Sequence, residues 1–353
     1  MSILNLAVLL LTLSLAAVSP ANVQAASTNE FQQLVKAARG EGKLVLWSST
    51  PPTVETPKLV EAFNKRFGMK IEVQQVSMIT ETFTNRILAG AQANRIEADL
   101  GQGAPDTAFV LLEKGMLQDF DWVGVFGQEF PLIKKRVERV GTPFRGKLID
   151  YWHLAYGIGY RTDRVAKGDL PKTWEDLTSP KWKGQVALSA TGGAIYHLAV
   201  VWGMEKLLDY TRKLKANQPV FASGIPAAAA ALESGSANLS VSTIGQFEYL
   251  KAKGLPVDWT VPNEIPIAIE HLIIPKGAPH LNLARLWAAW ITTEGRPLFE
   301  NLTKNGMVWS DEESFLSKKI KELGTKYQFA ETKEQDALVL EAKKKIVAIY
   351  LGK

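Results

Sequence analysis

Short strand-like runs alternate with helix-like runs along the 353-residue chain, and this alternation restricts the fold more than any other feature. Residues 43–47 (KLVLW) predict a buried strand, and residues 70–76 (KIEVQQV) alternate at the period of two that a strand requires. Between them, residues 59–67 place Leu59 and Phe63 on one face of a predicted helix. A strand, a helix and a strand in this order are typical of α/β layers, in which helices cover a sheet.

The same alternation continues to the C-terminus. Two long extended segments, residues 147–161 and residues 257–274, are interpreted as strands that cross from one body of the protein to a second. The remaining predicted strands are 185–189 and 238–242, and the remaining predicted helices are 81–93, 174–177, 194–202, 226–232, 246–253, 283–291, 294–302 and 333–350.

The first 25 residues predict a signal peptide. They contain no charged side chain, residues 6–17 are almost continuously apolar, and Val23-Gln24-Ala25 fits the small-x-small rule for cleavage before Ala26. The apolar run is too short to span roughly 30 Å of hydrocarbon as an anchor. The alternative is a buried N-terminal helix or strand. We expect export.

The chain contains no cysteine, and this restricts both its expected cellular location and the chemistry that its sites can perform. A lipid-anchored secreted protein needs a cysteine after its leader, so we expect a protein without a lipid anchor, free in the periplasm of a Gram-negative bacterium. Disulfides, thiolate metal sites and cysteine nucleophiles are excluded. The net charge of +5 suits the gathering of anions, and export argues against a nucleic-acid partner.

Catalytic and metal-binding motifs are missing from the sequence. The four histidines show no HExxH or clustered spacing, and no GxSxG or SxxK motif occurs. We therefore expect no enzyme activity, no metal and no cofactor.

Four ordered motifs carry a resemblance to a known family. The chain resembles the bacterial extracellular solute-binding proteins of ABC importers, and within them the branch that contains the ferric-iron, phosphonate, polyamine and thiamine binders. The motifs are residues 156–162 (YGIGYRT), 170–177 (LPKTWEDL), 180–184 (PKWKG) and 276–284 (KGAPHLNLA).

The resemblance implies an α/β fold of the type II periplasmic-binding-protein class, with two lobes, each a mixed sheet flanked by helices, and a ligand cleft between them. It also implies a monomer that hands a small-molecule ligand to an ABC permease in the inner membrane. We expect a signal peptide over residues 1–25. Lobe 1 is expected to comprise residues 26–150 and 265–310, and lobe 2 residues 151–264 and 311–353.

Serine, threonine and glycine residues follow several predicted strands, at the edge where a ligand sits in open α/β sheets. Backbone N–H groups at the following helix N-termini add donors, a combination that suits anions. Each hydroxyl also has a simpler interpretation as a helix cap. Gly192-Gly193 is the strongest single candidate, because a chain that approaches an anion closely favours residues without a Cβ. The candidate residues are Ser48, Ser49, Thr50, Ser77, Ser189, Thr191, Gly192, Gly193, Ser242 and Thr243.

Two further candidates lie on the crossing strands. Alternation places Trp152 and Leu154 on one face of the first crossing, where the indole ring could stack on a ligand or pack at the hinge. Glu270 lies on the return strand and could face the cleft.

The predicted ligand is a small organic anion, namely a phosphonate, phosphate ester, sulfonate or carboxylate, captured by lobe closure. The iron-binding branch holds ferric ion with an adjacent pair of tyrosines. The corresponding stretch here is residues 240–245, which contains no tyrosine, and Tyr196 and Tyr249 each stand alone. A binder of ferric iron or a ferric complex and a ligand-sensing subunit for a membrane receptor remain alternative functions.

Overall fold

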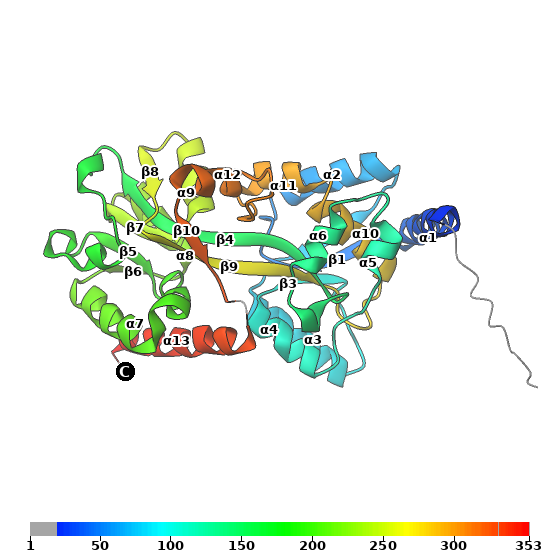
Figure 1. The fold of residues 1–353 in the computed structure, drawn as a ribbon, viewed down its shortest axis with the longest axis horizontal. Coiled ribbons are helices and arrows are strands. Elements are labelled where there is room, and N and C mark those ends of the chain that lie inside the picture. Colours follow the sequence, from blue (N-terminus) through cyan, green and yellow to red (C-terminus); the bar gives the residue numbers. More distant parts are fainter. Residues whose placement is uncertain (1–19, 331, 353) are drawn as a thin grey trace, which may run out of the picture.

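The computed structural model of the protein describes residues 20–330 and 332–352. Most of the predicted signal peptide, residues 1–19, lies outside the described residues, and residues 20–25 open the first helix. The chain forms two α/β lobes side by side, joined by two long strands that run through both of them (Figure 1).

The joining strands are β4 (Leu148–Arg161) and β9 (Glu264–Ile273), which pair antiparallel. They are the two segments predicted to cross between bodies, and they lie in the centre of one ten-stranded sheet. Eight of its strands follow the order β2-β1-β3-β9-β4-β7-β5-β6, while β10 pairs with β9 and β8 pairs with β4 off this path. The sheet passes from the first lobe into the second without interruption, because β4 pairs with β9 along its first half and with β7 along its second half.

The first lobe surrounds one end of this sheet. Helix α10 is apolar on nearly every side and is buried along most of its length, where it joins the main core cluster of the lobe. The strands are β1 (Lys43–Trp47), β2 (Glu72–Val76) and β3 (Leu100–Gly103). The helices are α1 (Pro20–Glu41), α2 (Thr56–Phe67), α3 (Thr80–Gln92), α4 (Pro105–Glu113), α5 (Trp122–Phe126), α6 (Ile133–Glu138), α10 (Leu281–Thr292) and α11 (Arg296–Thr303), with a 3₁₀ helix at Thr142–Phe144.

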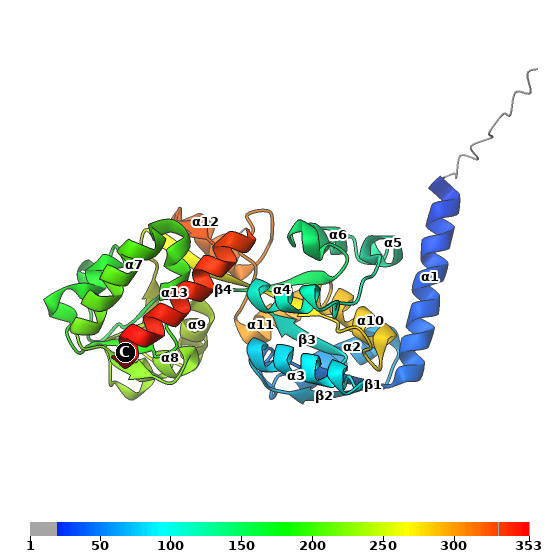
Figure 2. The same cartoon turned by 90° about the horizontal axis from the view of Figure 1, so that it is seen from below.

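The second lobe surrounds the other end of the sheet. Helix α13 packs along α7 on one side of this lobe, and its start lies beside α4 of the first lobe (Figure 2). The strands are β5 (Val186–Ser189), β6 (Val220–Ala222), β7 (Leu239–Thr243) and β8 (Val257–Thr260). The helices are α7 (Ala199–Ala216), α8 (Ile225–Ser234), α9 (Ile244–Ala252) and α13 (Lys333–Leu351), with 3₁₀ helices at Lys167–Asp169, Glu175–Thr178, Pro180–Trp182 and Ile195–Leu198.

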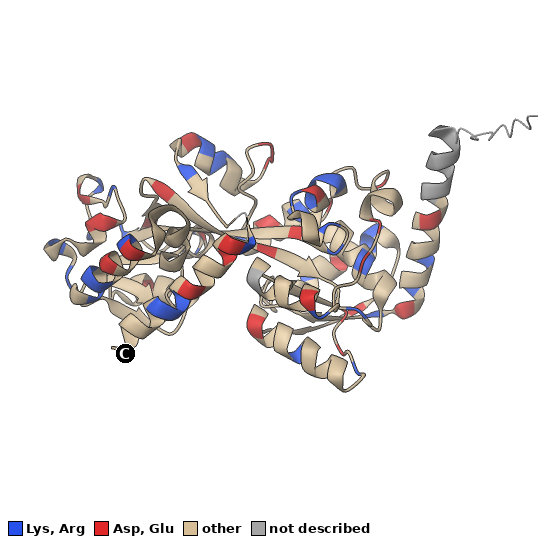
Figure 3. Cartoon of the chain, turned by 60° about the horizontal axis from the view of Figure 1, so that its bottom comes forward, with Lys and Arg blue, Asp and Glu red and all other residues tan. Residues whose placement is uncertain are grey.

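A short unit, helix α12 (Phe315–Leu323) and strand β10 (Lys326–Gln328), packs where the lobes meet. Strand β10 pairs parallel with the start of β9, and α12 buries Leu316 and Ile320 against apolar residues of β9. Lys and Arg residues are interspersed with Asp and Glu residues along the helices of both lobes (Figure 3).

The type II two-lobed fold predicted from the sequence is confirmed, but several elements were not predicted. Strand β3 reads LGQG, which has no apolar alternation. Its first glycine allows a close packing contact, since a Cβ at Gly101 would lie 2.2 Å from the ring of Phe83. The unpredicted strands and α-helices are β3, β6, β10, α1, α4, α5, α6 and α12.

A matching contact occurs on the crossing strand. A Cβ at Gly159 of β4 would lie 2.2 Å from the ring of Phe247 of α9, which is fully buried. We predict that Gly159→Ala lowers the free energy of unfolding by about 1–3 kcal/mol, the usual cost of overpacking a core. Urea denaturation measures this change. The control is Gly168→Ala, where nothing lies within 4 Å. Equal stability of the two variants would contradict the packing explanation.

Candidate functional site: the cleft between the lobes

A cavity of about 660 Å³ lies between the lobes, over one face of β4 and β9. Side chains alternate along a strand, so Trp152, Leu154 and Tyr156 of β4 all face this cavity. On β9 the register neighbours of Trp152 and Leu154 are Glu270 and Ala268, and both line the cavity as well. These five residues form the cavity floor.

Four helices begin at the cavity. The residues at or beside the starts of α3, α4, α8 and α9 line it, and in each case the N-cap residue makes no side-chain capping hydrogen bond. The first N–H groups of a helix have no partner within the helix and carry a partial positive charge. The cavity is therefore surrounded by backbone donors suited to an anion. The lining residues at these starts are Ile79, Thr80, Glu81, Ala104, Pro105, Gly224, Ile225, Pro226, Thr243 and Gln246.

Two ion pairs connect the lobes across the cleft. Lys343 Nζ of α13 lies 2.7 Å from Glu81 Oε1 of α3, and both residues line the cavity. Burial raises the pKa of Glu81, but the hydrogen bond and the charge of Lys343, together with hydrogen bonds from the Glu81 backbone and from Thr80, outweigh it, and the net pKa is lowered. Further along, Lys333 Nζ at the start of α13 lies 2.9 Å from Glu113 Oε1 of α4. Helix α13, which is part of the second lobe, therefore also forms ion pairs with the first lobe.

Aromatic rings form one wall of the cavity. The imidazole of His197 stacks on Tyr156, with 5.5 Å between ring centroids, and contacts Tyr196 at 4.4 Å. Burial raises the pKa of Tyr156 well above its usual value. Burial, aided by the charge of Lys343, lowers the pKa of His197 to about 3. Tyr156 and His197 are therefore neutral at neutral pH.

Half of the twelve predicted site residues line the cavity. They come from both lobes and from the crossing strands, as a cleft site requires. They are Ser49, Thr50, Trp152, Thr191, Thr243 and Glu270.

The other predicted hydroxyls do not line the cavity. Ser48 is fully buried, and its Oγ lies 2.5 Å from both Thr50 O and Gln102 Oε1. The Oγ of Ser242 donates to Ile225 O at 2.9 Å, which ties β7 to the start of α8. Ser189 Oγ lies 2.7 Å from the Thr191 hydroxyl, and Ser77 lies outside the lining. The role of these four residues in ligand binding stays a prediction.

The two adjacent glycines also lie outside the lining, and packing explains them. A Cβ at Gly192 would lie 2.8 Å from Ile346 of α13, and a Cβ at Gly193 would lie 2.8 Å from Ile225 of α8. The need for glycine at position 193 therefore comes from the approach of a helix, and at position 192 from the approach of a helix together with a positive φ of 76°. Contact with a ligand at Gly192 and Gly193 stays a prediction.

Several lining residues were not among the predicted site residues. Lys343 and Asp336 come from a C-terminal helix whose sequence has no feature pointing to a ligand. Tyr196 and His197 follow the Gly192-Gly193 loop. This closeness in sequence to a predicted site loop was the one feature that could have pointed to them as lining residues. The other polar residues of this set are Thr80, Glu81, Gln102, Tyr156, Ser223, Gln246, Thr303 and Asn305.

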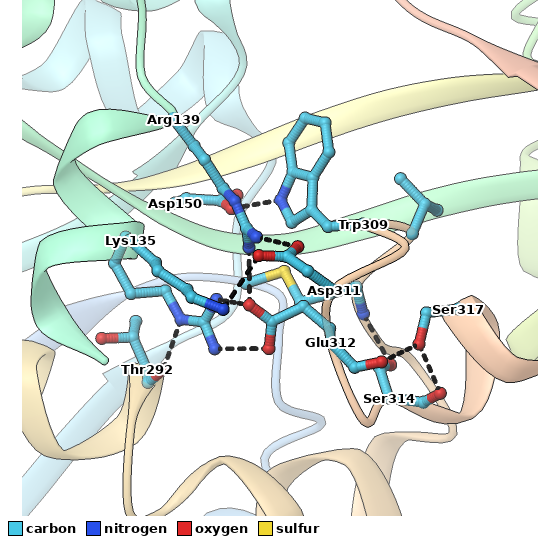
Figure 4. A network of polar contacts seen from close by, with 12 residues as sticks. Lys135, Arg139, Asp150, Thr292, Trp309, Asp311, Glu312, Ser314 and Ser317 are labelled. Carbon is cyan, nitrogen blue, oxygen red and sulfur yellow. Dashed lines mark hydrogen bonds and ion pairs between the residues drawn. The ribbon is translucent and has the colours of Figure 1, made fainter. Parts of the chain in front are cut away.

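The opposite face of the floor carries a buried polar network (Figure 4). Asp150 Oδ1 lies 2.9 Å from His153 Nε2, and its Oδ2 accepts a hydrogen bond from Trp309 Nε1 at 2.7 Å. Val308 N donates to His153 Nδ1 at 3.0 Å. Burial raises the pKa of Asp150, but His153 and Trp309 outweigh it and hold that pKa well below its usual value. These bonds attach the chain around Trp309 to β4.

A second part of the same network involves two arginines of the α6 region. The buried Arg136 donates to both carboxylate oxygens of Glu312, at 2.7 and 3.1 Å, and from Nε to Thr292 O at 2.7 Å. Arg139 donates to Glu312 at 2.6 Å. A bidentate, largely buried pair of this kind fixes geometry firmly. The segment after α11 is therefore held on two sides (Figure 4).

Comparison with known proteins places this arrangement in a class. The fold is that of the type II periplasmic binding proteins. It is similar to iron-bound HitA from Pseudomonas aeruginosa, with a TM-score of 0.67, 18% identity, and 87% of this chain and 99% of that chain covered. It is also similar to AfuA from Actinobacillus pleuropneumoniae with fructose-6-phosphate bound, with a TM-score of 0.65, 20% identity, and coverage of 88% and 98%.

The sequence defines the family. Residues 58–296 match the family described as bacterial extracellular solute-binding protein, and the chain belongs to that family. An uncharacterized protein of Haemophilus influenzae is 27% identical over 278 residues, which cover 74% of this chain and 76% of that protein. The family comprises extracellular or periplasmic transport proteins that bind small ligands and dock with an ABC permease.

Within residues 20–330 and 332–352, no helix combines the length and apolar character needed to cross a membrane. In the same part of the chain, no three histidine, aspartate or glutamate side chains gather as a group that could hold a metal ion.

Buried histidines predict a loss of stability in mild acid. Burial lowers the pKa of His197 to about 3 and that of His271 to about 4, whereas both rings have a pKa of about 6.5 in the unfolded chain. The unfolded state therefore binds more protons below about pH 6.5, and the free energy of unfolding falls as the pH drops toward 4. Urea denaturation at several pH values measures this slope. His197→Phe should make the slope shallower by about one proton, and parallel curves for the two proteins would contradict the assignment.

Proposed function

We propose that the protein is the periplasmic substrate-binding component of an ABC uptake transporter and captures a small organic anion by lobe closure. Phosphonates, phosphate esters, sulfonates and carboxylates are the ligand classes. The proposal includes export through the signal peptide, a free monomer without a lipid anchor, and an inner-membrane permease as the partner. It keeps the lobe boundaries of residues 26–150 with 265–310 and 151–264 with 311–353.

One observation carries the choice of an anion: four helix N-termini without side-chain caps begin at the same cavity. They come from both lobes, since α3 and α4 lie in the first lobe and α8 and α9 in the second. A negatively charged ligand in the cavity would contact donors on both sides and so favour the closed arrangement over an open one. A ligand shifts such an equilibrium only by its difference in affinity for the two states.

The ion pairs of α13 support closure. Lys343 and Glu81 face each other across the cleft at 2.7 Å, and opening the lobes would separate them. Each side chain is partly exposed, so the pair contributes modestly and is screened by salt. Lys343 also places a positive charge in the cavity lining, next to the space that the anion would occupy.

Ferric iron is the second candidate, because Tyr156 and Tyr196 line the same cavity. Ferric ion prefers anionic oxygen ligands, and burial raises the pKa of Tyr156 well above its usual value, so ionising this phenol is costly. The two tyrosines also come from separate elements, β4 and the 3₁₀ helix Ile195–Leu198. The anion therefore fits this cavity better than the bare metal ion.

A thermal-shift panel tests the proposal. The anions are fructose 6-phosphate, methylphosphonate, ethanesulfonate and citrate, and the contrasting probes are ferric chloride and spermidine. An anion at a hundredfold excess over its Kd should stabilise the protein by about 2.7 kcal/mol and raise the melting temperature. A shift with ferric chloride or spermidine and none with the four anions would contradict anion binding.

Replacement of the cleft lysine gives a second test. Lys343→Met should weaken binding of the anion that gives the largest shift by roughly three- to tenfold at low salt, because a charge beside the ligand and a cross-cleft pair are both lost. The difference from wild type should shrink at high salt. Calorimetric titration measures both effects. The control is Lys345→Met on the same helix, where the lysine pairs with Glu341 one turn away; equal weakening in both variants would remove Lys343 from the site.

A further inference from the structure

Two ring nitrogens at the cavity have no hydrogen-bond partner among the described residues. They are Trp152 Nε1 and His197 Nε2. Both residues line the cavity, and Trp152 is only 5% exposed. A buried polar group without a partner costs about 1–3 kcal/mol, so each such group in a native protein calls for an explanation.

Trp152 differs from Trp182 in that its indole lines the cavity. Trp182 Nε1 also lacks a partner among the described residues, but Trp182 lies in the 3₁₀ helix Pro180–Trp182 and does not line the cavity. Trp152 lies in the cavity floor, and residues at the starts of α3 and α4 line the same cavity. Its N–H therefore belongs to the same cavity as the uncapped helix N-termini.

His197 lines the same cavity as Trp152 and contacts the cavity floor through Tyr156. Tyr156 follows Trp152 by four residues on the same face of β4, and the imidazole of His197 stacks on Tyr156. Because the lowered pKa keeps this imidazole uncharged, it offers a hydrogen bond rather than a charge.

The chemistry of the indole restricts the ligand. An indole N–H donates and cannot accept, so its partner has to be an acceptor atom. Metal ions and protonated amines offer no such atom. An oxygen of a phosphonate, phosphate ester, sulfonate or carboxylate does, and a charged acceptor makes the stronger bond.

We propose that Trp152 Nε1 and His197 Nε2 are specificity-determining groups that hydrogen-bond oxygen atoms of the bound anion. This inference rests on the proposed function, and it assigns Trp152 a hydrogen-bonding role in place of ring stacking alone. The unmet hydrogen bonds destabilise the ligand-free protein slightly, and the ligand satisfies them. Trp152 and His197 thus provide neutral contacts, while the helix N-termini and Lys343 supply the positive potential.

Four variants test this inference. Trp152→Phe removes the N–H and keeps an aromatic ring, and Trp182→Phe makes the same change outside the cavity. His197→Phe removes the ring nitrogens, and His197→Gln restores a polar group of similar reach. Calorimetric titration with fructose 6-phosphate, methylphosphonate, ethanesulfonate and citrate gives the affinities, and thermal unfolding without ligand gives the stability.

We expect Trp152→Phe to weaken at least tenfold every anion that wild type binds. Both Trp→Phe changes remove the same buried volume, so the melting temperature of ligand-free Trp152→Phe should fall no further than that of Trp182→Phe. Trp182→Phe should bind within twofold of wild type. His197→Phe should weaken binding, and His197→Gln should recover part of the loss. A side chain that serves ligand binding rather than folding would produce this result, namely weaker binding with no loss of stability beyond that of the control variant.

Three results would overturn the inference. Unchanged anion affinity in Trp152→Phe would contradict it and leave the proposed function standing. A melting temperature of ligand-free Trp152→Phe that falls clearly below that of Trp182→Phe would assign the N–H to the fold. Failure of all four anions to bind wild type would refute the proposed function, and the inference would fall with it.

Discussion

The antiparallel pairing of β4 with β9 is the interaction on which the rest of the structure depends. It joins residues 148–155 to residues 267–273, and both strands are buried along nearly their whole length. Because side chains alternate across a sheet, the pairing places Trp152 and Glu270 next to each other in the cavity floor. A slip of one residue in either strand would turn that strand's set of side chains away from the cleft.

The two faces of this strand pair differ in what they contact. One face, with Trp152, Leu154 and Tyr156, lines the cavity, and we propose that its polar groups contact the ligand. The other face carries Asp150 and His153, whose hydrogen bonds are satisfied by Trp309 and Val308. Buried networks that are satisfied fix a unique geometry, whereas unsatisfied groups at a cleft mark function. The contrast between the faces is the physical basis for locating the site.

The parts of the site that follow local rules could be predicted from the sequence. The long aromatic strand revealed the crossing, its alternation placed Trp152, and the hydroxyls after β1 and β7 pointed to Ser49 and Thr243, which do line the cavity. What could not be predicted depends on packing between distant elements. Nothing near Lys343 indicates that α13 reaches across to Glu81 of α3. The glycines at 192 and 193 suggested an anion loop, but they are required by contacts with Ile346 and Ile225, residues far along the chain.

The central claim is that an anion is held by helix N-termini of both lobes over the β4–β9 floor. Hydrogen–deuterium exchange of the backbone amides in the first turns of α3, α4, α8 and α9, with and without a bound anion from the panel, tests it most directly. The account predicts slower exchange in the first turns of all four helices when the anion is present, with little change in the exposed turns of α2. The claim would be contradicted if a saturating concentration of the anion left these four first turns unprotected, or if it protected helices of one lobe alone.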